Sequence, residues 1–367
     1  MSDLHLDMPF TSLGDTDKAN IRKKELFDCL KSIAERIMAQ NIDLLIIGGD
    51  FFEDKWVKGA TISAVKNLFS ELYRTEIIIC PGNHDPLNEK SYYKAFEWGS
   101  NVHILEDSRQ VLYLEKYNTC IYNMGTGGNV KNDYPVILDK KLSDEKFNFL
   151  VFHGTVDMPF EENNYNSITS KEILSLGMDY VALGHMHCYF VVQNEKTIMI
   201  NPGSPQPLGF DEEGRHGYIQ GKIVASDENT KHAETEFISA ASRYYHKLEV
   251  NISECISDKA VIDRILAEIT AEDLYSVSLK GFISEEYCMD IKNIAEALYK
   301  SCFFIKFKNL TAIQFNYERY LEDPGIKGEF VRRIMDMQKS ETTDEERETL
   351  FMALQYGLQA LENGRVD

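Results

Sequence analysis

Short apolar runs alternate with amphipathic helical patterns over about the first 210 residues of the chain. The first helical pattern, which Asn20 would cap, has apolar positions at helical spacing: Leu26, Leu30, Ile33 and Ile37. A second helical pattern covers residues 58–73. Four short apolar runs are predicted as buried strands: 44–47, 77–79, 149–152 and 180–183. Because strands and helices alternate, we expect an α/β core in this part of the chain.

The hydrophobic pattern changes near residue 243. Residues 214–242 are predicted to contain the closing strands of a first domain, which we place at 1–242. The next segment, 243–320, is predicted as a small α+β domain in which strands and helices alternate as βαβαβ. Its predicted elements are strands at 247–252, 274–283 and 303–308 and helices near 257–270 and 289–300.

The last segment, residues 321–367, is predicted as a linker followed by one helix. Three residues indicate a linker over 321–329: Pro324, Gly325 and Gly328. Thr343 and Glu346 have the spacing of a capping box at the start of the helix. The helix carries a leucine stripe: Leu350, Leu354, Leu358 and Leu361. We expect this stripe either to pack on its own domain or to dock on a helix of a partner protein.

The composition favours a folded protein without a membrane anchor. Apolar residues make up 43% of the 367 positions, but the longest apolar run is about six residues, far shorter than the roughly 20 of a membrane helix. The chain does not open with a basic and then apolar segment, so we expect a soluble, cytoplasmic protein. Seven scattered cysteines without a CxxC pair argue against a disulfide framework and against a thiolate zinc site.

The chain is strongly acidic, because 39 Lys and Arg stand against 59 Asp and Glu and give a net charge of −20. This argues against a protein that coats nucleic acid through bulk electrostatics, since such binding comes from neutralising phosphates with Lys and Arg. A local basic groove, bound divalent ions or a basic partner would still allow contact with nucleic acid. The acidity by itself favours solubility.

Four of the predicted strands end in clusters of polar side chains, and a fifth cluster opens the chain. The candidate ligands in these clusters are Asp3, His5, Asp50, Asn83, His153, His185 and His187. His84 and Asp85 directly follow Asn83. In open α/β sheets, sites form outside the carboxyl ends of the strands. We therefore expect all five clusters to meet at one edge of the sheet.

Carboxylates and imidazoles together suit divalent ions such as Mn²⁺, Fe²⁺ or Zn²⁺. Asp3 and His5 are two positions apart, so in an extended chain they point the same way and can hold one ion. The glycines before Asp50, Asn83 and His185 would let the backbone turn sharply at each strand end. Seven ligands are too many for one ion but suit two ions about 3.5–4 Å apart that share a carboxylate. Asp50 is the natural bridge.

This pattern resembles the calcineurin-like metallophosphoesterase superfamily. The matching motifs are Asp3-x-His5, Gly49-Asp50, Gly82-Asn83-His84-Asp85, His153-Gly154 and Gly184-His185-x-His187. The opening Ser2–Asp7 segment, the turn before His84 and the sequence Asn201–Pro205 resemble the SbcD/YhaO branch of DNA repair exonucleases. The resemblance covers about residues 1–220. It implies a two-layer β-sandwich flanked by helices, followed by a small capping domain and a C-terminal helix that binds a partner.

The resemblance also implies a dinuclear site that usually works with Mn²⁺, with Fe²⁺, Zn²⁺ or Mg²⁺ as the other candidates. By position, the ligands of the first ion would be Asp3, His5 and His187. Those of the second ion would be Asn83, His153 and His185, with Asp50 as the bridge. His84 would face the phosphate and donate a proton to the leaving oxygen, and Asp85 would orient it. Two ions also lower the pKa of a water between them, so the site would hydrolyse a phosphodiester.

Two departures from the branch change these expectations. A strand of about five or six apolar residues precedes the DxH motif in the branch, whereas this sequence begins at Met1. A missing core strand leaves hydrogen bonds of its neighbours unmade, so we expect Asp3 and His5 to be held loosely and the first metal site to be weak. Some relatives carry a histidine three residues after the bridging aspartate. Glu53 stands there in this chain, so we do not expect a second histidine contact to the phosphate.

Three functions are compatible with these features. The first is a DNA exonuclease that works with an SbcC-type coiled-coil ATPase, which the C-terminal leucine stripe would contact. The second is a metallophosphoesterase for a small molecule such as a cyclic nucleotide, which the acidity favours. The third is a non-catalytic binding subunit. We expect the first, with DNA and the ATPase as partners, because the second domain and the motif at 201–205 favour it. A homodimer stays open as its assembly.

Overall fold

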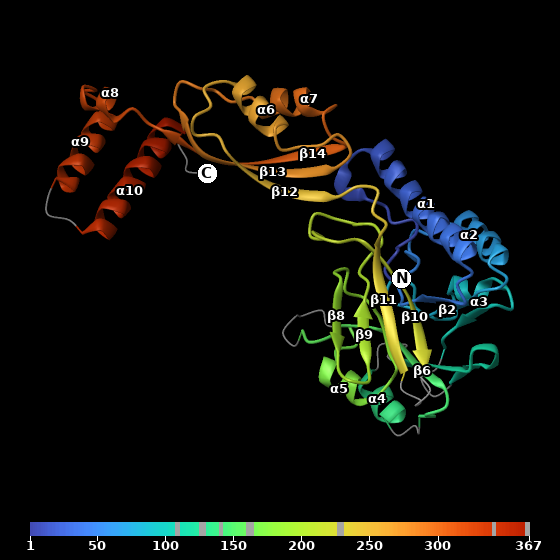
Figure 1. Ribbon diagram of the computed structural model, residues 1–367. Coiled ribbons are helices and arrows are strands. Elements are labelled where there is room, and N and C mark those ends of the chain that lie inside the picture. The colour runs from blue at the N-terminus through green and yellow to red at the C-terminus, as the bar shows by residue number, and fades with distance from the viewer. Residues whose placement is uncertain are drawn as a thin grey trace. The chain divides into compact units, whose positions relative to one another are not determined.

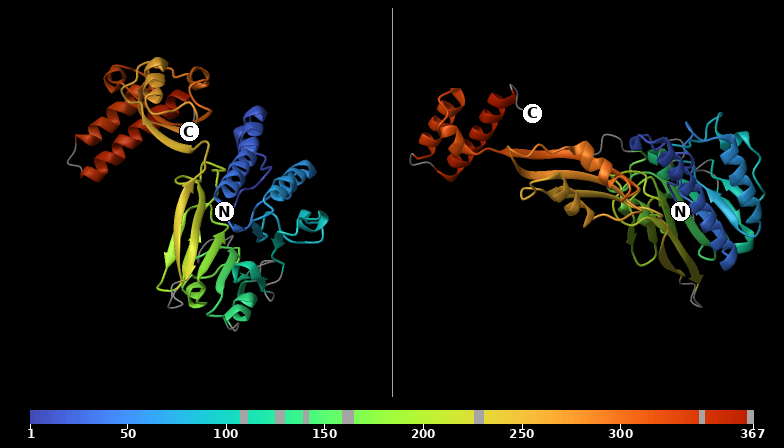
Figure 2. Two further views of the ribbon diagram at one scale, coloured as in Figure 1. Left: turned by 45° about the vertical axis from the view of Figure 1, so that its right-hand side comes forward. Right: turned by 90° about the horizontal axis from the view of Figure 1, so that it is seen from above.

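The computed structural model describes residues 1–106, 111–124, 130–138, 142–158, 165–225, 231–339 and 343–363. Its chain divides into two compact units, Met1–Tyr244 and Tyr245–Asp367. The structure confirms the predicted α/β fold class, with sheets and helices in both units (Figures 1 and 2). The residues predicted as a third segment, 321–367, belong to the second unit.

The smaller sheet of the first unit has three parallel strands in the order β1-β2-β3. These strands are β1 (Leu44–Ile47), β2 (Glu76–Ile79) and β3 (Val102–Ile104). Helices α1 (Thr16–Gln40) and α2 (Gly59–Glu71) lie beside this sheet (Figure 2). The predicted helices and strands of this region are confirmed. The predicted cap is wrong, because the side chain of Asp15, not Asn20, accepts the N–H groups of the first turn of α1.

The larger sheet has six strands in the order β4-β5-β6-β7-β9-β8. They are β4 (Leu112–Leu114), β5 (Thr119–Met124), β6 (Phe147–His153), β7 (Tyr180–Gly184), β8 (Phe190–Gln193) and β9 (Ile198–Asn201). The four inner strands are parallel to one another, and the two edge strands pair antiparallel. Helices α4 (Val130–Leu138) and α5 (Ser170–Ser175) pack on this sheet through Ile137 and Ile173.

An apolar layer holds the two sheets face to face. Ile78 from β2 packs in one cluster with Phe149 and Val151 from β6. Leu44 and Ile46 of β1 pack against the same cluster. Successive side chains of a strand point to opposite faces, so the other two residues of β1 face away from the larger sheet. The first unit is therefore a β-sandwich, as the family resemblance implies. It also contains the short helix α3 (Tyr92–Ala95) and an antiparallel hairpin of β10 (Gly217–Ala225) and β11 (Lys231–Ser239).

The second unit begins with a parallel sheet in the order β12-β13-β14. Its elements are β12 (Tyr245–Asn251), α6 (Asp258–Leu266), β13 (Leu274–Ser284), α7 (Ile291–Leu298) and β14 (Phe304–Gln314). Both helices lie on one face of this sheet (Figure 1), where Val261 and Ile294 pack with Val250, Val277 and Leu279. The predicted βαβαβ series is confirmed.

Three helices end the second unit: α8 (Tyr317–Leu321), α9 (Ile326–Gln338) and α10 (Asp344–Asn363). The predicted linker over 321–329 is wrong, because α9 begins at Ile326 and a turn of four residues separates it from α8. The capping box is confirmed, since Thr343 and Glu346 exchange backbone and side-chain hydrogen bonds.

The leucine stripe of α10 packs within its own unit. Leu354 and Leu358 are buried and share a core with Tyr320 of α8 and Val331 of α9. Of the two alternatives that the sequence left open, the structure therefore supports packing on the stripe's own domain for these two leucines. Among the described residues, no helix is both long and apolar enough to cross a lipid bilayer.

Candidate metal centre

Strand ends of both sheets in the first unit supply five of the seven predicted ligands. The smaller sheet contributes Asp50 after β1 and Asn83 after β2. The larger sheet contributes His153 at the end of β6, and His185 and His187 after β7. The prediction of a single sheet edge is wrong in this respect. These five ligands come from two sheets that face each other across the apolar layer.

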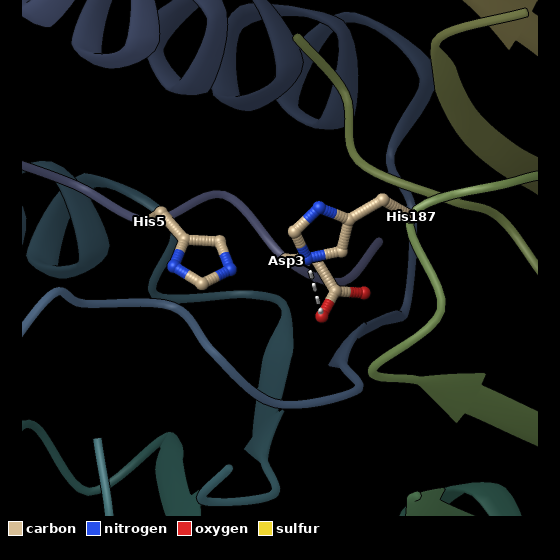
Figure 3. A group of neighbouring side chains, drawn as sticks. All are labelled: Asp3, His5 and His187. Atoms are coloured by element: carbon tan, nitrogen blue, oxygen red, sulfur yellow. Dashed lines mark ion pairs between the residues drawn. The ribbon is translucent and has the colours of Figure 1, made fainter. Parts of the chain in front are cut away.

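Asp3, His5 and His187 form a first group of candidate ligands. One ligand atom from each lies within 4.8 Å of the others, and Nε2 of His187 is 3.9 Å from Oδ1 of Asp3. Figure 3 shows the three side chains turned toward one another, His187 from the loop after β7 and the other two from the N-terminal segment. This is the set that the family resemblance implies for the first ion, and its binding of an ion stays a prediction.

Backbone hydrogen bonds hold the N-terminal segment in place. The N–H of Asp3 donates to the carbonyl of Gly49, and that of His5 donates to the carbonyl of Asp50, each at 3.0 Å. Both Asp3 and His5 are buried. The expectation that these two residues are held loosely is therefore wrong, because the segment pairs with the chain that follows β1.

The backbone of the site adopts left-handed conformations at several ligands. The φ angle is 54° at Asp3 and 47° at His5, so this segment is not extended. The expectation that an extended chain points both side chains the same way is therefore wrong. Asp50 and His185 also have positive φ, of 48° and 90°. Non-glycine residues in this region cost about 1–3 kcal/mol each and persist where the surroundings hold them, often at functional sites.

Asp50, His153 and His185 form a second group of candidate ligands. Asn83 lies among them, because its Oδ1 is 3.1 Å from Nε2 of His153 and 3.0 Å from Nδ1 of His185. Oδ2 of Asp50 is 3.2 Å from Nε2 of His153 and 3.7 Å from Nε2 of His5. Asp50 thus lies between the two groups, at the place where the sequence predicts the bridging ligand.

Fixed acceptors lie next to the outer ring nitrogen of three site histidines. Oε2 of Glu53 is 2.9 Å from Nδ1 of His5, and Oε1 of Glu212 is 2.7 Å from Nδ1 of His187. A backbone carbonyl lies 2.8 Å from Nδ1 of His153. When Nδ1–H donates to such an acceptor, Nε2 carries the lone pair and faces the site. Metal-binding histidines in proteins are held in this way.

The donor set fits divalent cations. The Nε2 atom of His5 is buried and has no hydrogen-bond partner within the part of the chain that the structure describes. A buried polar atom without a partner is costly, and a cation next to Asp3 and His187 would satisfy it. Carboxylate, amide and imidazole donors match Mn²⁺, Fe²⁺ and Zn²⁺. The residues present therefore suit the two ions that the family resemblance implies.

Two glycines allow the close approach of these side chains. A Cβ at Gly49 would lie 2.1 Å from Nδ1 of His153, and the φ of Gly49 is +107°. A Cβ at Gly82 would lie 2.1 Å from Oδ1 of Asp50. The glycine before Asp50 thus permits the sharp turn that the sequence predicts, whereas Gly82 is needed for the space that it leaves.

The sequence Asn201–Pro205 supports the loop after β7. The side-chain amide of Asn201 donates to two backbone carbonyls of that loop. The N–H of Ser204 donates to the carbonyl of His187 at 3.3 Å, and its hydroxyl donates to Glu212 at 2.9 Å. The motif therefore holds both a candidate ligand and the carboxylate that orients this ligand.

His84 lies at the opening of the site. Its side chain is 44% exposed, compared with 3% for His5 and 2% for His153. The backbone N–H of His84 donates to Oδ1 of Asp50 at 2.8 Å, and Nδ1 lies 2.9 Å from Oε1 of Glu53. With Nδ1 held in this way, Nε2 is the ring nitrogen that a substrate can reach.

Asp85 does not orient His84, contrary to the expectation from the family resemblance. Its Oδ2 accepts hydrogen bonds from the backbone N–H groups of Phe51 and Phe52, at 2.8 and 3.1 Å, and from the hydroxyl of Tyr93. Its Oδ1 accepts a backbone N–H of its own loop at 2.7 Å. Among the residues described, no hydrogen bond joins Asp85 to His84. Asp85 instead ties the loop after β2 to the loop after β1.

Neighbouring charges shift the pKa values of the site. Burial opposes ionisation of Asp50, but His153 and His5 hold the pKa of its carboxyl well below the ordinary range. Burial also lowers the pKa of His153, but Asp50 raises it to about 9. For Glu53, hydrogen bonds from His5 and His84 outweigh burial and lower the pKa to about 2. The bond to Glu53 in turn raises the pKa of His84. Without metal, protons on the imidazoles thus offset the charge of the ionised carboxylates, and metal binding would displace protons from the histidines that become ligands.

Two carboxylates of the site are not among the residues that the sequence predicts. Glu53 stands out only as a departure from the resembling branch, although its place three residues after Asp50 is a usable signal. Glu212 was not singled out, because it lies in a run of acidic residues, 211–213, that has no distinguishing pattern.

Replacing Asp50 should weaken both cation sites, whereas replacing His187 should weaken one. We expect about two Mn²⁺ per chain in the unaltered protein, about one in His187→Ala and no tightly bound ion in Asp50→Asn, because Asp50 faces both groups. Equilibrium dialysis followed by elemental analysis measures the stoichiometry. His232→Ala, at an exposed ring on β11, is the control and should keep both ions. Equal losses in the two site variants would contradict the bridging position of Asp50.

Comparisons with known proteins identify relatives of this chain. The "Uncharacterized metallophosphoesterase YhaO" of Bacillus subtilis (strain 168) is 24% identical over 273 residues, which are 72% of this chain and 65% of YhaO. The "DNA double-strand break repair protein Mre11" of Methanopyrus kandleri is 26% identical over 246 residues, 59% of this chain and 51% of that protein. The matched part thus spans less than two thirds of the length of either relative.

A solved structure and a family profile complete the comparison. The phosphopantetheinyl hydrolase of Mycobacterium tuberculosis matches 44% of this chain and 78% of its own, at 15% identity and a TM-score of 0.27, which is too low to support an argument. The profile described as "Calcineurin-like phosphoesterase" matches residues 1–189, a range that contains every candidate ligand. Because this range is more than half of the chain, the protein belongs to the calcineurin-like phosphoesterase family, whose members bind two divalent metal ions.

Proposed function

We propose that this chain is a two-metal-dependent phosphodiesterase that acts on DNA as an exonuclease. The observation that carries the proposal is the position of His84, whose exposed ring lies beside one residue from each of the two groups of candidate ligands, His5 and Asp50. Membership of the family implies hydrolysis of phosphoesters. The relative named for DNA double-strand break repair supports DNA as the substrate.

The residues of the site have distinct roles in this reaction. The two groups of ligands would hold two divalent cations, most simply Mn²⁺, which neutralise the charge of a phosphodiester and lower the pKa of water. In hydrolysis, a water oxygen bonds to phosphorus while the bond to the sugar oxygen breaks. Nε2 of His84 would donate a proton to the departing sugar oxygen. The proton that the water loses balances this transfer.

The sheet of the second unit offers a basic surface for DNA. Its apolar core residues Val277 and Leu279 face α6 and α7, so alternation and register place four lysines on the opposite face: Lys247, Lys280, Lys306 and Lys308. Glu249 lies on the same face and pairs with Lys280 at 2.6 Å, so the other three lysines supply the positive charge of this face. Lys247 and Lys306 stand on either side of the small Ser276. Local positive charge of this kind allows an acidic chain to contact phosphates.

Substituting His84 should slow turnover strongly without removing the cations. The ring is the proposed proton donor and not a ligand, so His84→Ala should bind as much Mn²⁺ as the unaltered protein and cleave about 10²–10⁴-fold more slowly. Linear duplex DNA labelled at either end, incubated with Mn²⁺, gives the rate and the end polarity. Equal losses of bound metal and rate would contradict the assigned role.

The same assay with small substrates tests the substrate class. If bis(p-nitrophenyl) phosphate or a cyclic nucleotide is turned over but DNA is not, the substrate is a small molecule, as the acidity of the chain would favour. If neither is turned over while Mn²⁺ is bound, hydrolysis is excluded and a binding role is left.

Reversing charge on the basic sheet face should weaken DNA binding. Removing one lysine that pairs with a phosphate reduces the slope of log K against log salt by about one, so Lys306→Glu with Lys308→Glu should reduce it by about two. Fluorescence anisotropy of labelled DNA over a range of KCl concentrations measures this slope. Lys292→Glu with Lys300→Glu, on the α7 side of the same unit, is the matched control and should leave the slope unchanged. Identical slopes in the two double variants would exclude this face.

We also propose that α10 contacts a coiled-coil ATPase, although not through the buried leucine stripe. The support is an exposed apolar set on the same helix, Phe351, Met352 and Tyr356. Apolar side chains that remain exposed on a helix are suited to packing against a partner helix.

Introducing charged residues into this exposed set should abolish the interaction with the ATPase. Phe351→Glu with Tyr356→Glu should no longer co-elute with a co-expressed coiled-coil ATPase, because charge would replace the apolar surface while the buried leucines keep the fold. The thermal midpoint should stay the same, and Glu348→Lys on the same helix serves as the control. Undiminished co-elution of the double variant would rule this surface out.

A further inference from the structure

We propose that Glu53 is a positioning residue that holds two histidines with one carboxylate: His5, a candidate ligand, and His84, the proposed proton donor. By fixing the ring of His84, Glu53 would set how strongly turnover depends on protonation of the leaving group. The inference rests on the proposed function of His84, and its test separates the two.

The carboxylate of Glu53 contacts both rings at once. Oε2 lies 2.9 Å from Nδ1 of His5 and 3.0 Å from Nδ1 of His84, and Oε1 lies 2.9 Å from Nδ1 of His84. The two ring centroids are 4.7 Å apart in an edge-to-face arrangement. A single side chain therefore fixes the orientation of a candidate ligand and of the proton donor relative to each other.

Glu53 can do this because its own position is fixed. Its N–H donates to the carbonyl of Leu6 at 3.1 Å, and its carbonyl accepts two N–H groups of the following turn, each at 2.8 Å. The N–H of the next residue, Asp54, donates to the carbonyl of His84 at 3.1 Å. The chain around Glu53 is thus tied both to the N-terminal segment and to the loop that carries His84.

The chemistry of a carboxylate determines which protonation forms of the two imidazole rings this contact favours. An ionised carboxylate only accepts hydrogen bonds, so it favours the ring forms that carry a proton on Nδ1. In His5 this directs the Nε2 lone pair into the site. In His84 it leaves Nε2 at the opening of the site. A displacement of about 1 Å in such a constellation can cost on the order of 10²-fold in rate.

Glu212 provides a matched comparison. Its side chain is 11% exposed, the same as that of Glu53. Its Oε1 lies 2.7 Å from Nδ1 of His187, and its other oxygen accepts from the hydroxyl of Ser204 and from the backbone N–H of Leu208. Each carboxylate therefore orients one candidate ligand of the first ion. Among the contacts described, Glu53 is the one of the two that also holds His84.

Glutamine is the informative replacement at both positions. It keeps the shape of glutamate but replaces one acceptor oxygen with an NH₂ donor. Both oxygens of Glu53 lie within 3.0 Å of Nδ1 of His84, so in either orientation the NH₂ group faces the Nδ1–H of His84. Glu53→Gln should therefore disturb the ring of His84, while Glu212→Gln can keep its bond to His187. Bound Mn²⁺ is measured in every variant, and rates are compared at saturating Mn²⁺.

Leaving-group dependence separates positioning of the donor from an effect on the metal. A p-nitrophenolate departs without a proton, whereas a sugar alkoxide needs one. We expect Glu53→Gln to lose about 10²-fold in kcat on thymidylyl-thymidine and less than about tenfold on thymidine 5′-p-nitrophenyl phosphate. Glu212→Gln should change both rates by the same factor. The double variant Glu53→Gln with His84→Ala should show the same ratio of the two substrates' rates as His84→Ala alone, because the two residues act as one unit.

Imidazole ¹H–¹⁵N correlation spectra test the contact without turnover or metal. The spectra of the unaltered protein should show Nδ1–H forms for His5 and His84, assigned by comparison with His84→Ala. Glu53→Gln should alter these signals, and Glu212→Gln should leave the His84 signal unchanged.

The outcomes distinguish failure of this inference from failure of the proposed function. Equal losses on both thymidine substrates together with an unchanged His84 signal in Glu53→Gln would overturn the positioning role while hydrolysis stands. If the unaltered protein cleaves neither substrate, the proposed function fails, and the spectra alone still decide whether Glu53 holds His84.

Discussion

The whole site depends on carboxylates that are buried and yet remain ionised. Removing a charge from water is costly unless opposite charges and hydrogen bonds compensate it. Asp50 illustrates the solution, because one of its oxygens accepts the N–H of His84 and the other faces the rings of His5 and His153. Carboxylates and imidazoles thereby fix each other's orientation. The ring nitrogens that face inward then converge within the two groups of candidate ligands.

The fold supplies the rigidity that this arrangement requires. Parallel strands of both sheets end at the site, and the apolar layer between the sheets keeps those ends together. The chain then leaves β1 through Gly49, where any side chain would overlap His153, and places Asp50 in a left-handed conformation. Strained backbone at a ligand persists only where packing and hydrogen bonds determine it. The site is therefore a property of the two sheets and not of a flexible loop.

The sequence predicts the strands and most of the side chains that gather at their ends, but not how these side chains are supported. Runs such as 44–47 and 77–79 are short, apolar and followed by polar clusters, so their role is readable locally. The supporting contacts join distant positions, since Glu53 and His5 are 48 residues apart and Glu212 and His187 are 25 apart. Glu53 is marked only by its place three residues after Asp50, and nothing distinguishes Glu212 among 59 acidic residues until the chain is folded. Their role follows from tertiary contacts, as does the role of Asp85 in tying two loops together.

The acidity of the chain and its proposed substrate are compatible once distance is considered. At physiological salt, charges separated by more than about 8 Å are largely screened, so a net charge of −20 does not decide what a phosphate meets locally. Asp3, Asp50 and Glu53 make the site itself attractive to cations and repulsive to a phosphodiester. Two divalent cations would reverse that sign. We therefore infer that cations bind before the phosphodiester, which makes the buried carboxylates a requirement for recognising an anion and not an obstacle to it.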